Sequence, residues 1–347
     1  MPEDAVARAV ASGDPEAAIV ESALLPGRSE RTVTPAEVEA RGGPTAREIV
    51  EIVQAWGFPP PGLDEPALTE EEAHVFCELA ELSEIWSPEL TIQLARIYGR
   101  LLARIARTGV QLFRLYAGPR LRATSEDRAD ELRSMREAFA RLLTLPDPIL
   151  AGVHRRYLEY ELAQTAIDAA ESSDPELSLT GAVEVTFLFC DLKDFTAYAN
   201  AEGDAAAVEA IADFARQVDA ERGEDGRVVK ALGDGHMLCY SDVGEAVAAG
   251  ERIIRRMRAD GPLRVHASVH TGVAISREGD YFGGAVNLAA RLLAAADADE
   301  LVASRPVASG TAETFEWEPL GRRRVRGVDE PVEVFRLRGA RPSARRQ

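Results

Sequence analysis

Residues 228–240 read VVKALGDGHMLCY, and this stretch predicts two short strands joined by a tight turn. The apolar runs RVVKAL and HMLCY flank Gly233-Asp234-Gly235, where glycine supplies the positive φ that a hairpin turn needs. The stretch also contains Lys230, one of two lysines among the 40 Lys and Arg residues of the chain. A compact ammonium is therefore retained at a position where a guanidinium would be the usual choice in this sequence.

The segments around this hairpin alternate between strand and helix patterns. VEVTFLFC (183–190) reads as a strand and residues 204–221 as a helix, both before the hairpin. A helix at 243–259, a strand at 263–276, a helix at 284–296 and a last strand at 331–338 follow it. Strand, helix, hairpin, helix and strand form the order of a ferredoxin-like βαββαβ unit, so this half is predicted to be α+β.

The N-terminal half has helical periodicity instead. Apolar residues recur at helical spacing from about residue 45 to 173, and Thr69 with Glu72 has the pattern of a capping box. The segment 172–181, SSDPELSLTG, interrupts this pattern. We therefore predict an all-helical domain at 1–170, a linker at 171–182, an α+β domain at 183–340 and a basic tail at 341–347.

Residues 31–57 raise the alternative of DNA binding, because their pattern resembles a winged helix-turn-helix. Its second helix carries Glu48 and Glu51 beside Arg47, which is unfavourable for phosphate contact. Packing within an interaction domain is the preferred interpretation.

Composition limits the partners of the chain. A net charge of −18 argues against surfaces for nucleic acid or anionic membranes. Apolar runs such as 185–190 are too short to span a bilayer, and the N-terminus does not have the pattern of a signal peptide. Three cysteines without CxxC spacing indicate buried free thiols, so we expect a cytoplasmic protein.

Two carboxylates are the first candidates for chemistry. Asp191 ends the strand 183–190, and Asp234 lies in the turn of the hairpin. The first strand of a βαββαβ sheet lies beside the hairpin, so both side chains can meet at one edge. Two carboxylates together with substrate phosphates are a common way to bind Mg²⁺. The alternative is that Asp191 caps a turn and Asp234 only forms one.

A second candidate group lies at 280–291, DYFGGAVNLAAR. Asn287 and Arg291 are four residues apart, so they share one face of an otherwise apolar helix. The preceding Gly283-Gly284 permits close approach of a ligand to a helix N-terminus, which favours anions. Arg291 alone would read as a surface residue.

The three segments FCDLKDFT, VVKALGDGHM and DYFGGAVNLAAR resemble, in order and spacing, the catalytic domain of class III nucleotidyl cyclases. The resemblance covers about half of the chain, and the combination of motifs is highly specific. Residues 45–165 also resemble the helical regulatory domain that precedes such catalytic domains in some actinobacterial cyclases.

The resemblance implies a role for each candidate residue. Asp191 and Asp234 would hold two metal ions per site, Mg²⁺ or Mn²⁺. Arg291 would stabilise charge at the α-phosphate and Asn287 would orient the ribose. In the family these two pairs come from different subunits, so a homodimer is implied, with a 3′,5′-cyclic nucleotide and pyrophosphate as products.

The resemblance also implies why Lys230 is a lysine. In the family its position and that of Asp280 read the base. An ammonium donor and a carboxylate acceptor match N1 and the 6-amino group of adenine, which implies ATP. Guanine has a donor at N1 and an acceptor at O6, the reverse of adenine. A guanylate cyclase that uses GTP is therefore the alternative.

Two positions depart from the family pattern. Asp194 replaces a usual glycine, and Lys193 either balances its charge or faces solvent. Arg326 occupies a position where the family often has a phosphate-contacting lysine. A catalytically silent dimeric scaffold is the remaining alternative, although the six matching positions argue against it.

Overall fold

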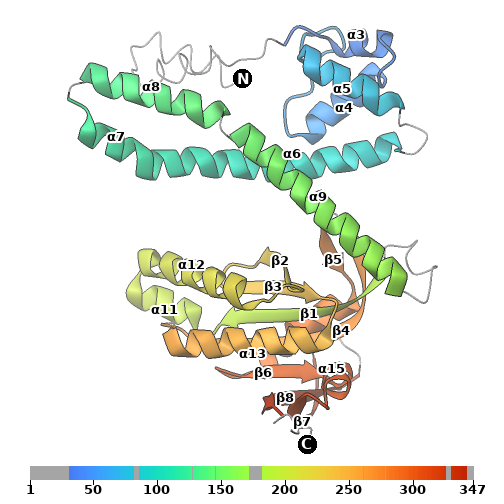
Figure 1. Cartoon of the computed structure of the whole chain (residues 1–347), viewed down its shortest axis with the longest axis vertical. Coiled ribbons are helices and arrows are strands. Elements are labelled where there is room, and N and C mark those ends of the chain that lie inside the picture. The colour runs from blue at the N-terminus through green and yellow to red at the C-terminus, as the bar shows by residue number, and fades with distance from the viewer. Residues whose placement is uncertain are drawn as a thin grey trace, which may run out of the picture. The chain divides into compact units, whose positions relative to one another are not determined.

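The computed structural model describes residues 31–81, 86–126, 128–144, 146–171, 182–260, 262–277, 279–325 and 330–341. The chain forms two compact units, Met1–Glu171 and Ser172–Gln347 (Figure 1). The predicted basic tail at 341–347 lies outside the described residues except for Arg341, as do most of the linker and Arg326. None of the helices that the structure describes combines the length and apolar character needed to cross a bilayer.

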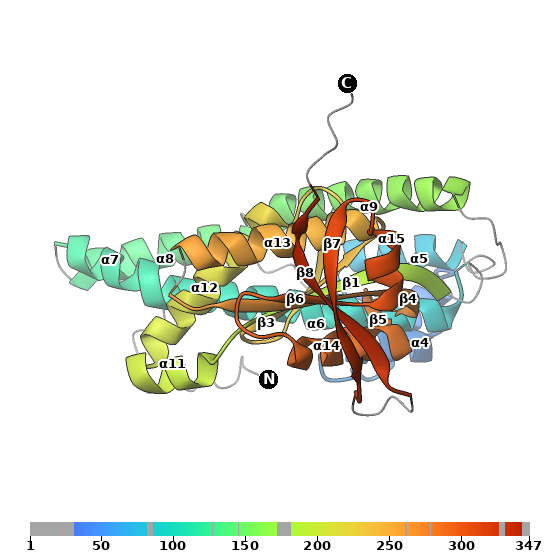
Figure 2. The ribbon, with the colours of Figure 1, turned by 90° about the horizontal axis from the view of Figure 1, so that it is seen from below.

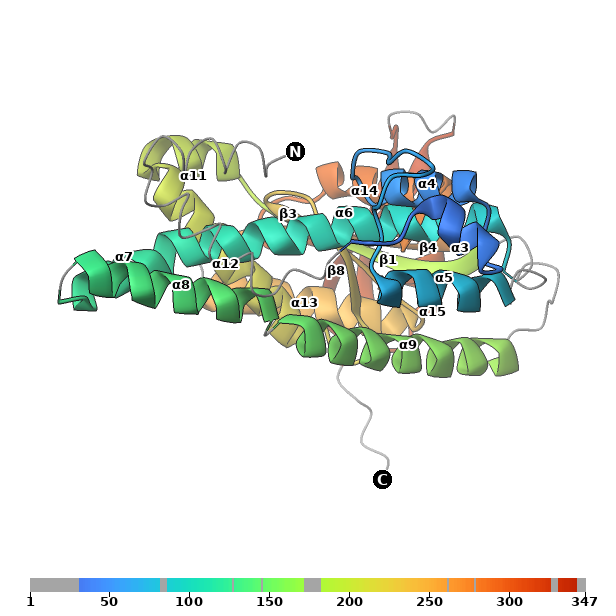
Figure 3. The same cartoon turned by 90° about the horizontal axis from the view of Figure 1, so that it is seen from above.

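The described part of the first unit is helical. Its elements are α3 (Pro35–Ala40), α4 (Ala46–Ala55), α5 (Glu70–Glu81), α6 (Pro88–Leu112), a π-helical turn (Phe113–Ala117), α7 (Gly118–Thr124), α8 (Arg128–Thr144) and α9 (Pro146–Glu171). Figure 3 shows α7 and α8 side by side. The π turn precedes Pro119, which has no N–H to donate within the helix, so the backbone adjusts there.

Among the described residues of this unit, three helices begin with a threonine–glutamate capping box. Thr69 and Glu72 exchange the predicted pair of hydrogen bonds, at 2.9 and 3.1 Å. The same arrangement begins α3 and α4. On α4, Ile49 and Ile52 are buried in a core with Phe76, as expected for a helix that packs within a domain.

The second unit is built on one mixed sheet. Its strands are β1 (Ala182–Leu192), β2 (Arg227–Ala231), β3 (Gly235–Tyr240), β4 (Val265–Arg277), β5 (Asp280–Phe282), β6 (Leu301–Ser304), β7 (Phe315–Arg323) and β8 (Val332–Ala340). They lie in the order β2-β3-β1-β4-β6-β8-β7, and β5 pairs with β4. The β4–β6 pair is parallel and the other pairs are antiparallel. The predicted α+β class is confirmed.

The helices of this unit are α11 (Phe195–Glu202), α12 (Asp204–Glu221), α13 (Val243–Asp260), α14 (Gly284–Leu292), a 3-10 turn η2 (Leu293–Ala295) and α15 (Arg305–Gly310). Strand, helices, hairpin, helix and strand from β1 to β4 follow the predicted order. The sheet continues beyond the four strands of the βαββαβ order through β6, β8 and β7. Of these, β8 corresponds to the strand predicted at 331–338, whereas β6 and β7 were not predicted.

Alternate residues of β1 supply two separate cores. Leu188 and Cys190 pack with α12 and α13 on one face of the sheet. Phe187 and Phe189 pack against α14 on the other face (Figure 2). Because side chains alternate along a strand, Asp191 follows Phe187 and Phe189 on the α14 face. This alternation brings the first candidate carboxylate to the end of that face.

Candidate active site

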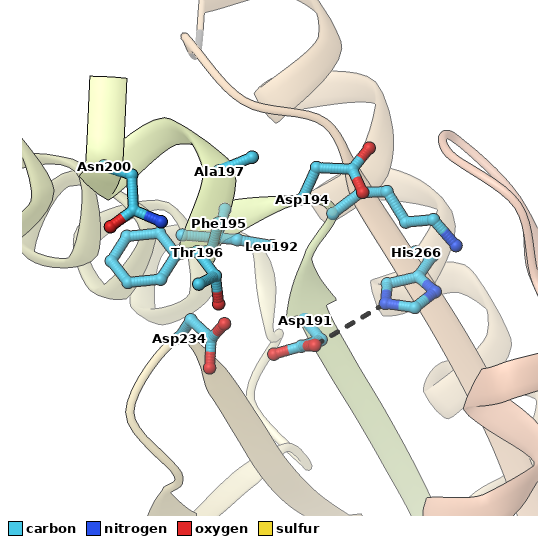
Figure 4. A pocket seen from close by; sticks show the side chains of 10 residues that line it. Asp191, Leu192, Asp194, Phe195, Thr196, Ala197, Asn200, Asp234 and His266 are labelled. Carbon is cyan, nitrogen blue, oxygen red and sulfur yellow. Dashed lines mark ion pairs between the residues drawn. The ribbon is translucent and has the colours of Figure 1, made fainter. Parts of the chain in front are cut away.

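Strand pairing brings Asp191 and Asp234 together. Asp191 lies opposite Gly235 of β3 and opposite His266 of β4 in the strand register. Asp234 immediately precedes β3, and its carbonyl accepts a hydrogen bond from the Leu192 N–H at 3.1 Å. Figure 4 shows the two carboxylates turned toward each other. The two side chains therefore lie together at one edge of the sheet, as predicted.

The two carboxylates line one open cavity of about 560 Å³. Its lining combines acidic, basic and apolar side chains from the end of β1 and the turn after it, from α11, from the β2–β3 turn and from β4: Asp191, Leu192, Lys193, Asp194, Phe195, Thr196, Ala197, Asn200, Asp234 and His266. A space of this volume accommodates a small-molecule ligand rather than a solvent molecule alone.

The electrostatics of the cavity favour a bound cation. Burial raises the pKa of Asp234, and the negative charge of Asp191 raises it further. Among the described residues, no group of three or more His, Cys, Asp and Glu side chains is arranged as a metal site. Asp191 and Asp234 would contribute two carboxylates, and phosphate oxygens and water would complete the coordination, as suits Mg²⁺. The donor set fits the implied metal ions.

Asp194, the residue that replaces a usual glycine, lines the same cavity. Its backbone is left-handed, with φ 58°, and its side chain does not cap α11. A non-glycine residue in this region is strained relative to glycine. The departure therefore adds a third carboxylate to the cavity, in a backbone conformation that glycine adopts without strain.

Lys230 and Asp280 meet as a close ion pair. The Lys230 Nζ lies 2.8 Å from Oδ1 and 2.6 Å from Oδ2 of Asp280. The Tyr281 N–H also donates to Oδ1, at 2.8 Å, which fixes the carboxylate. The ammonium keeps a third N–H, and the carboxylate keeps free lone pairs, so the pair can both donate to and accept from one ligand edge.

Asn287 and Arg291 lie on the exposed face of α14. The opposite face is anchored to the sheet by Ala285, Ala289 and Leu292, which are buried. Neither Asn287 nor Arg291 belongs to the described lining of the Asp191 cavity, and neither do Lys230 and Asp280. One chain thus presents the Asp191–Asp234 carboxylates, the Lys230–Asp280 ion pair and the exposed Asn287 and Arg291 of α14 as separate groups.

His266 is a neighbour of the carboxylates that the sequence motifs did not predict. His266 Nδ1 donates to the Ala296 carbonyl at 3.1 Å, and its Nε2 lies 3.6 Å from Asp191 Oδ2. The available signal was the pairing of two predicted strands, but their register is not contained in either strand alone. Lys193 also donates to the Ala296 carbonyl, at 3.3 Å, a contact that neither sequence interpretation of Lys193 included.

Comparisons with known proteins point to one class. The chain is 28% identical to an adenylate cyclase of Streptomyces coelicolor over 87% of this chain and 77% of that protein. It is 27% identical to the pH-sensitive adenylate cyclase MT1302 of Mycobacterium tuberculosis, over 73% of this chain and 64% of that protein. The solved adenylyl cyclase CyaB of Pseudomonas aeruginosa matches 46% of this chain and 96% of its own, with 23% identity and TM-score 0.42. No family model matches the chain.

The two sequence relatives confirm the resemblance to class III nucleotidyl cyclases that the three motifs predicted. Within that class, both named sequence relatives are adenylate cyclases. The Streptomyces alignment spans 310 residues, more than the second unit contains, so the similarity extends into the helical first unit.

Proposed function

We propose that the chain is an adenylate cyclase that converts ATP into 3′,5′-cyclic AMP and pyrophosphate. The convergence of Asp191 and Asp234 on one cavity is the observation that carries the proposal. In the reaction, the ribose 3′-oxygen forms a bond to the α-phosphorus while the bond from that phosphorus to the β-phosphate bridging oxygen breaks. The 3′-hydroxyl proton leaves to solvent.

The side chains of this chain divide the work of the reaction. Asp191 and Asp234 would hold two Mg²⁺ or Mn²⁺ ions, which supply activation of the 3′-hydroxyl and neutralisation of phosphate charge. Arg291 would bind the α-phosphate oxygens as negative charge develops there, and Asn287 would orient the ribose. Arg326, outside the described residues, would contact the phosphates.

A homodimer would assemble these groups into two sites. In a single chain the cavity of Asp191 and Asp234 is not lined by Asn287 or Arg291, which leaves the α14 pair exposed and available to a second copy. A two-fold dimer would use each surface twice, so that each subunit supplies carboxylates to one site and α14 to the other.

A direct assay tests the function. Purified full-length protein with ATP and either Mg²⁺ or Mn²⁺ is expected to form cyclic AMP and pyrophosphate in equal amounts. The same assay with GTP measures substrate choice. Exclusive formation of cyclic GMP would assign a guanylate cyclase, and absence of any cyclic product with both nucleotides and both metals would leave a catalytically silent protein.

Base choice is expected to depend on the Lys230–Asp280 pair. Lys230→Glu combined with Asp280→Cys removes the donor and the acceptor that match adenine. Each mispaired base edge costs about 1–3 kcal/mol, so kcat/KM for ATP should fall by about tenfold or more relative to kcat/KM for GTP. Val228→Ala, on the same strand, is the matched control. An unchanged ATP-to-GTP ratio would remove the pair from the base pocket.

Gly235 is expected to be required for the position of the Asp191 carboxylate. A Cβ at Gly235 would lie 2.6 Å from Asp191 Oδ1, closer than contact distance, so Gly235→Ala must displace that side chain. The expected result is a raised half-saturating Mn²⁺ concentration and a rate lowered by about tenfold or more. A Cβ at Gly310 would meet no atom within 4 Å, so Gly310→Ala is the control. Unchanged metal dependence in Gly235→Ala would contradict the proposed ligand geometry.

The helical first unit is proposed to regulate the second. Its last helix, α9, ends at Glu171, and β1 begins at Ala182 and carries Asp191 near its end. A site shared between two subunits is sensitive to small rotations of either one, so a signal that moves α9 can change the rate without blocking the cavity. The similarity to adenylate cyclases that extends into this unit supports the proposal.

A further inference from the structure

The Ala296 carbonyl joins two parts of the second unit. Ala296 follows η2, and η2 directly continues α14, so this carbonyl stands at the C-terminal end of the helical segment that carries Asn287 and Arg291. Two side chains donate to it: His266 through Nδ1 at 3.1 Å and Lys193 through Nζ at 3.3 Å. The end of α14 is thereby attached to residues outside the helix.

Both donors belong to the carboxylate side of the cavity. Lys193 lies two residues after Asp191, and its backbone N–H donates to the Arg264 carbonyl at 2.8 Å, which fixes this part of the chain. His266 pairs with Asp191 in the β1–β4 register and also approaches its carboxylate. A continuous path of contacts therefore runs from Asp191 to the end of α14.

The position of Ala296 explains why a donor is favourable here. Ala296 follows η2 in an extended conformation, with ψ 134°, so its carbonyl has no partner within the helix. Ala296 is buried, with 1% of its surface exposed, so a carbonyl at this position needs donors other than bulk water. Lys193 places a full positive charge at this position and is itself only partly buried.

We propose that Lys193 is a positioning residue that holds the C-terminal end of α14, with His266 as its partner, and so places Arg291 for catalysis. The proposal rests on the adenylate cyclase function and shared dimer site proposed above. In such a dimer, α14 of one subunit serves the site whose carboxylates belong to the other. Lys193 would therefore act on the opposite site, although it lies beside the carboxylates of its own chain.

Lys193 could have a second role, in which its substitution would affect the site of its own carboxylates rather than the site that its α14 serves. Lys193 lines the cavity, so it could instead bind a substrate phosphate beside its own Asp191 and Asp234. The positioning role is favoured because the structure shows the ammonium on the Ala296 carbonyl. The two roles are separated by asking which subunit of a one-site dimer needs Lys193.

The experiment uses full-length heterodimers isolated through two different affinity tags. One subunit carries Asp191→Ala and supplies α14 to the single complete site; the other carries Arg291→Ala and supplies the carboxylates. Lys193→Met, which keeps the length of the side chain but removes the donor, is placed on one subunit or on the other. Rates are measured against ATP and Mn²⁺ concentration, and melting temperatures are compared.

Lys193→Met on the Asp191→Ala subunit is expected to lower kcat by about tenfold, since small displacements of a catalytic group have large effects on rate. The half-saturating ATP and Mn²⁺ concentrations should stay the same, because the carboxylate half of the site is unaltered. Lys193→Arg at the same place retains a donor and should restore most of the rate. Lys193→Met on the Arg291→Ala subunit should have little effect.

Four outcomes would overturn the proposal. A loss confined to the Arg291→Ala subunit would show that Lys193 acts at its own carboxylates. Equal losses in both placements, or a loss in neither, would show that it does not position α14 for the opposite site. A parent heterodimer that forms but has no activity would instead refute the shared site, and the role of Lys193 in it would fall with that assignment.

Discussion

Alanine in place of either Asp191 or Asp234 is expected to lower the rate of cyclic AMP formation by on the order of a hundredfold or more. The reason is that a bound metal ion contributes several kcal/mol of transition-state stabilisation, and each carboxylate is half of the set that the protein provides. The measurement is kcat with ATP at saturating Mn²⁺. Asp204→Asn, at an exposed position on α12, is the control for loss of a surface charge.

The metal-free stability of the same variants provides an independent readout. The pKa of Asp234 is raised in the folded chain by burial and by Asp191, so the folded state binds more protons than the unfolded state as pH rises from the unfolded to the folded pKa. The stability contributed by this group is present below the unfolded pKa and is lost as pH increases through the folded pKa.

At neutral pH the charged pair is therefore unfavourable without metal. Asp234→Asn should melt at a higher temperature than the wild-type protein in chelator at pH 7, and the difference should shrink at acidic pH.

Each of the two predictions has an outcome that would contradict it. A variant of either aspartate that retains more than about a tenth of the wild-type rate would contradict the two-carboxylate metal site. An Asp234→Asn protein that melts lower at pH 7 would contradict the electrostatic account of the pair.

Local signals account for the part of the fold that the sequence predicted. The turn at Gly233-Asp234-Gly235 specifies the β2–β3 hairpin through residues adjacent in sequence. The run 183–190 is long and apolar enough to be recognised as β1, and the helical periods of α12 and α13 are equally local. These elements place Asp191 beside the hairpin, so the sequence alone was enough to predict that Asp191 lies close to Asp234.

The remainder depends on contacts between distant segments. β5 has three residues and β6 has four, which is too short for a periodic pattern, and β6 is defined by parallel pairing with β4. The ion pair of Lys230 on β2 with Asp280 on β5 joins two strands that are distant in sequence. The family resemblance implied only that both positions read the base. The Ala296 carbonyl has no side-chain signature at all, so its two donors become visible only in three dimensions.

Mixing Asp191→Ala chains with Arg291→Ala chains is expected to recover activity that neither variant has alone. Each homodimer would contain two sites that lack one essential group. A heterodimer would contain one site with both groups and one site with neither. Random pairing makes half of the dimers mixed, so the recovered rate should approach about a quarter of that of the wild-type protein at the same total concentration.

The structural reason for this expectation is that the Asp191–Asp234 carboxylates and the Asn287–Arg291 pair of α14 are separate groups within one chain. The cavity that contains Asp191 does not include Arg291 in its described lining, and Arg291 is exposed on α14. Mixing Asp191→Ala chains with Asp234→Ala chains is the control, because both changes fall in the same half of a site and should give no recovery. Recovery in that control would mean that Asp191 and Asp234 act from different chains. No recovery in the Asp191–Arg291 mixture, when heterodimers are shown to form, would mean that each chain builds its site alone.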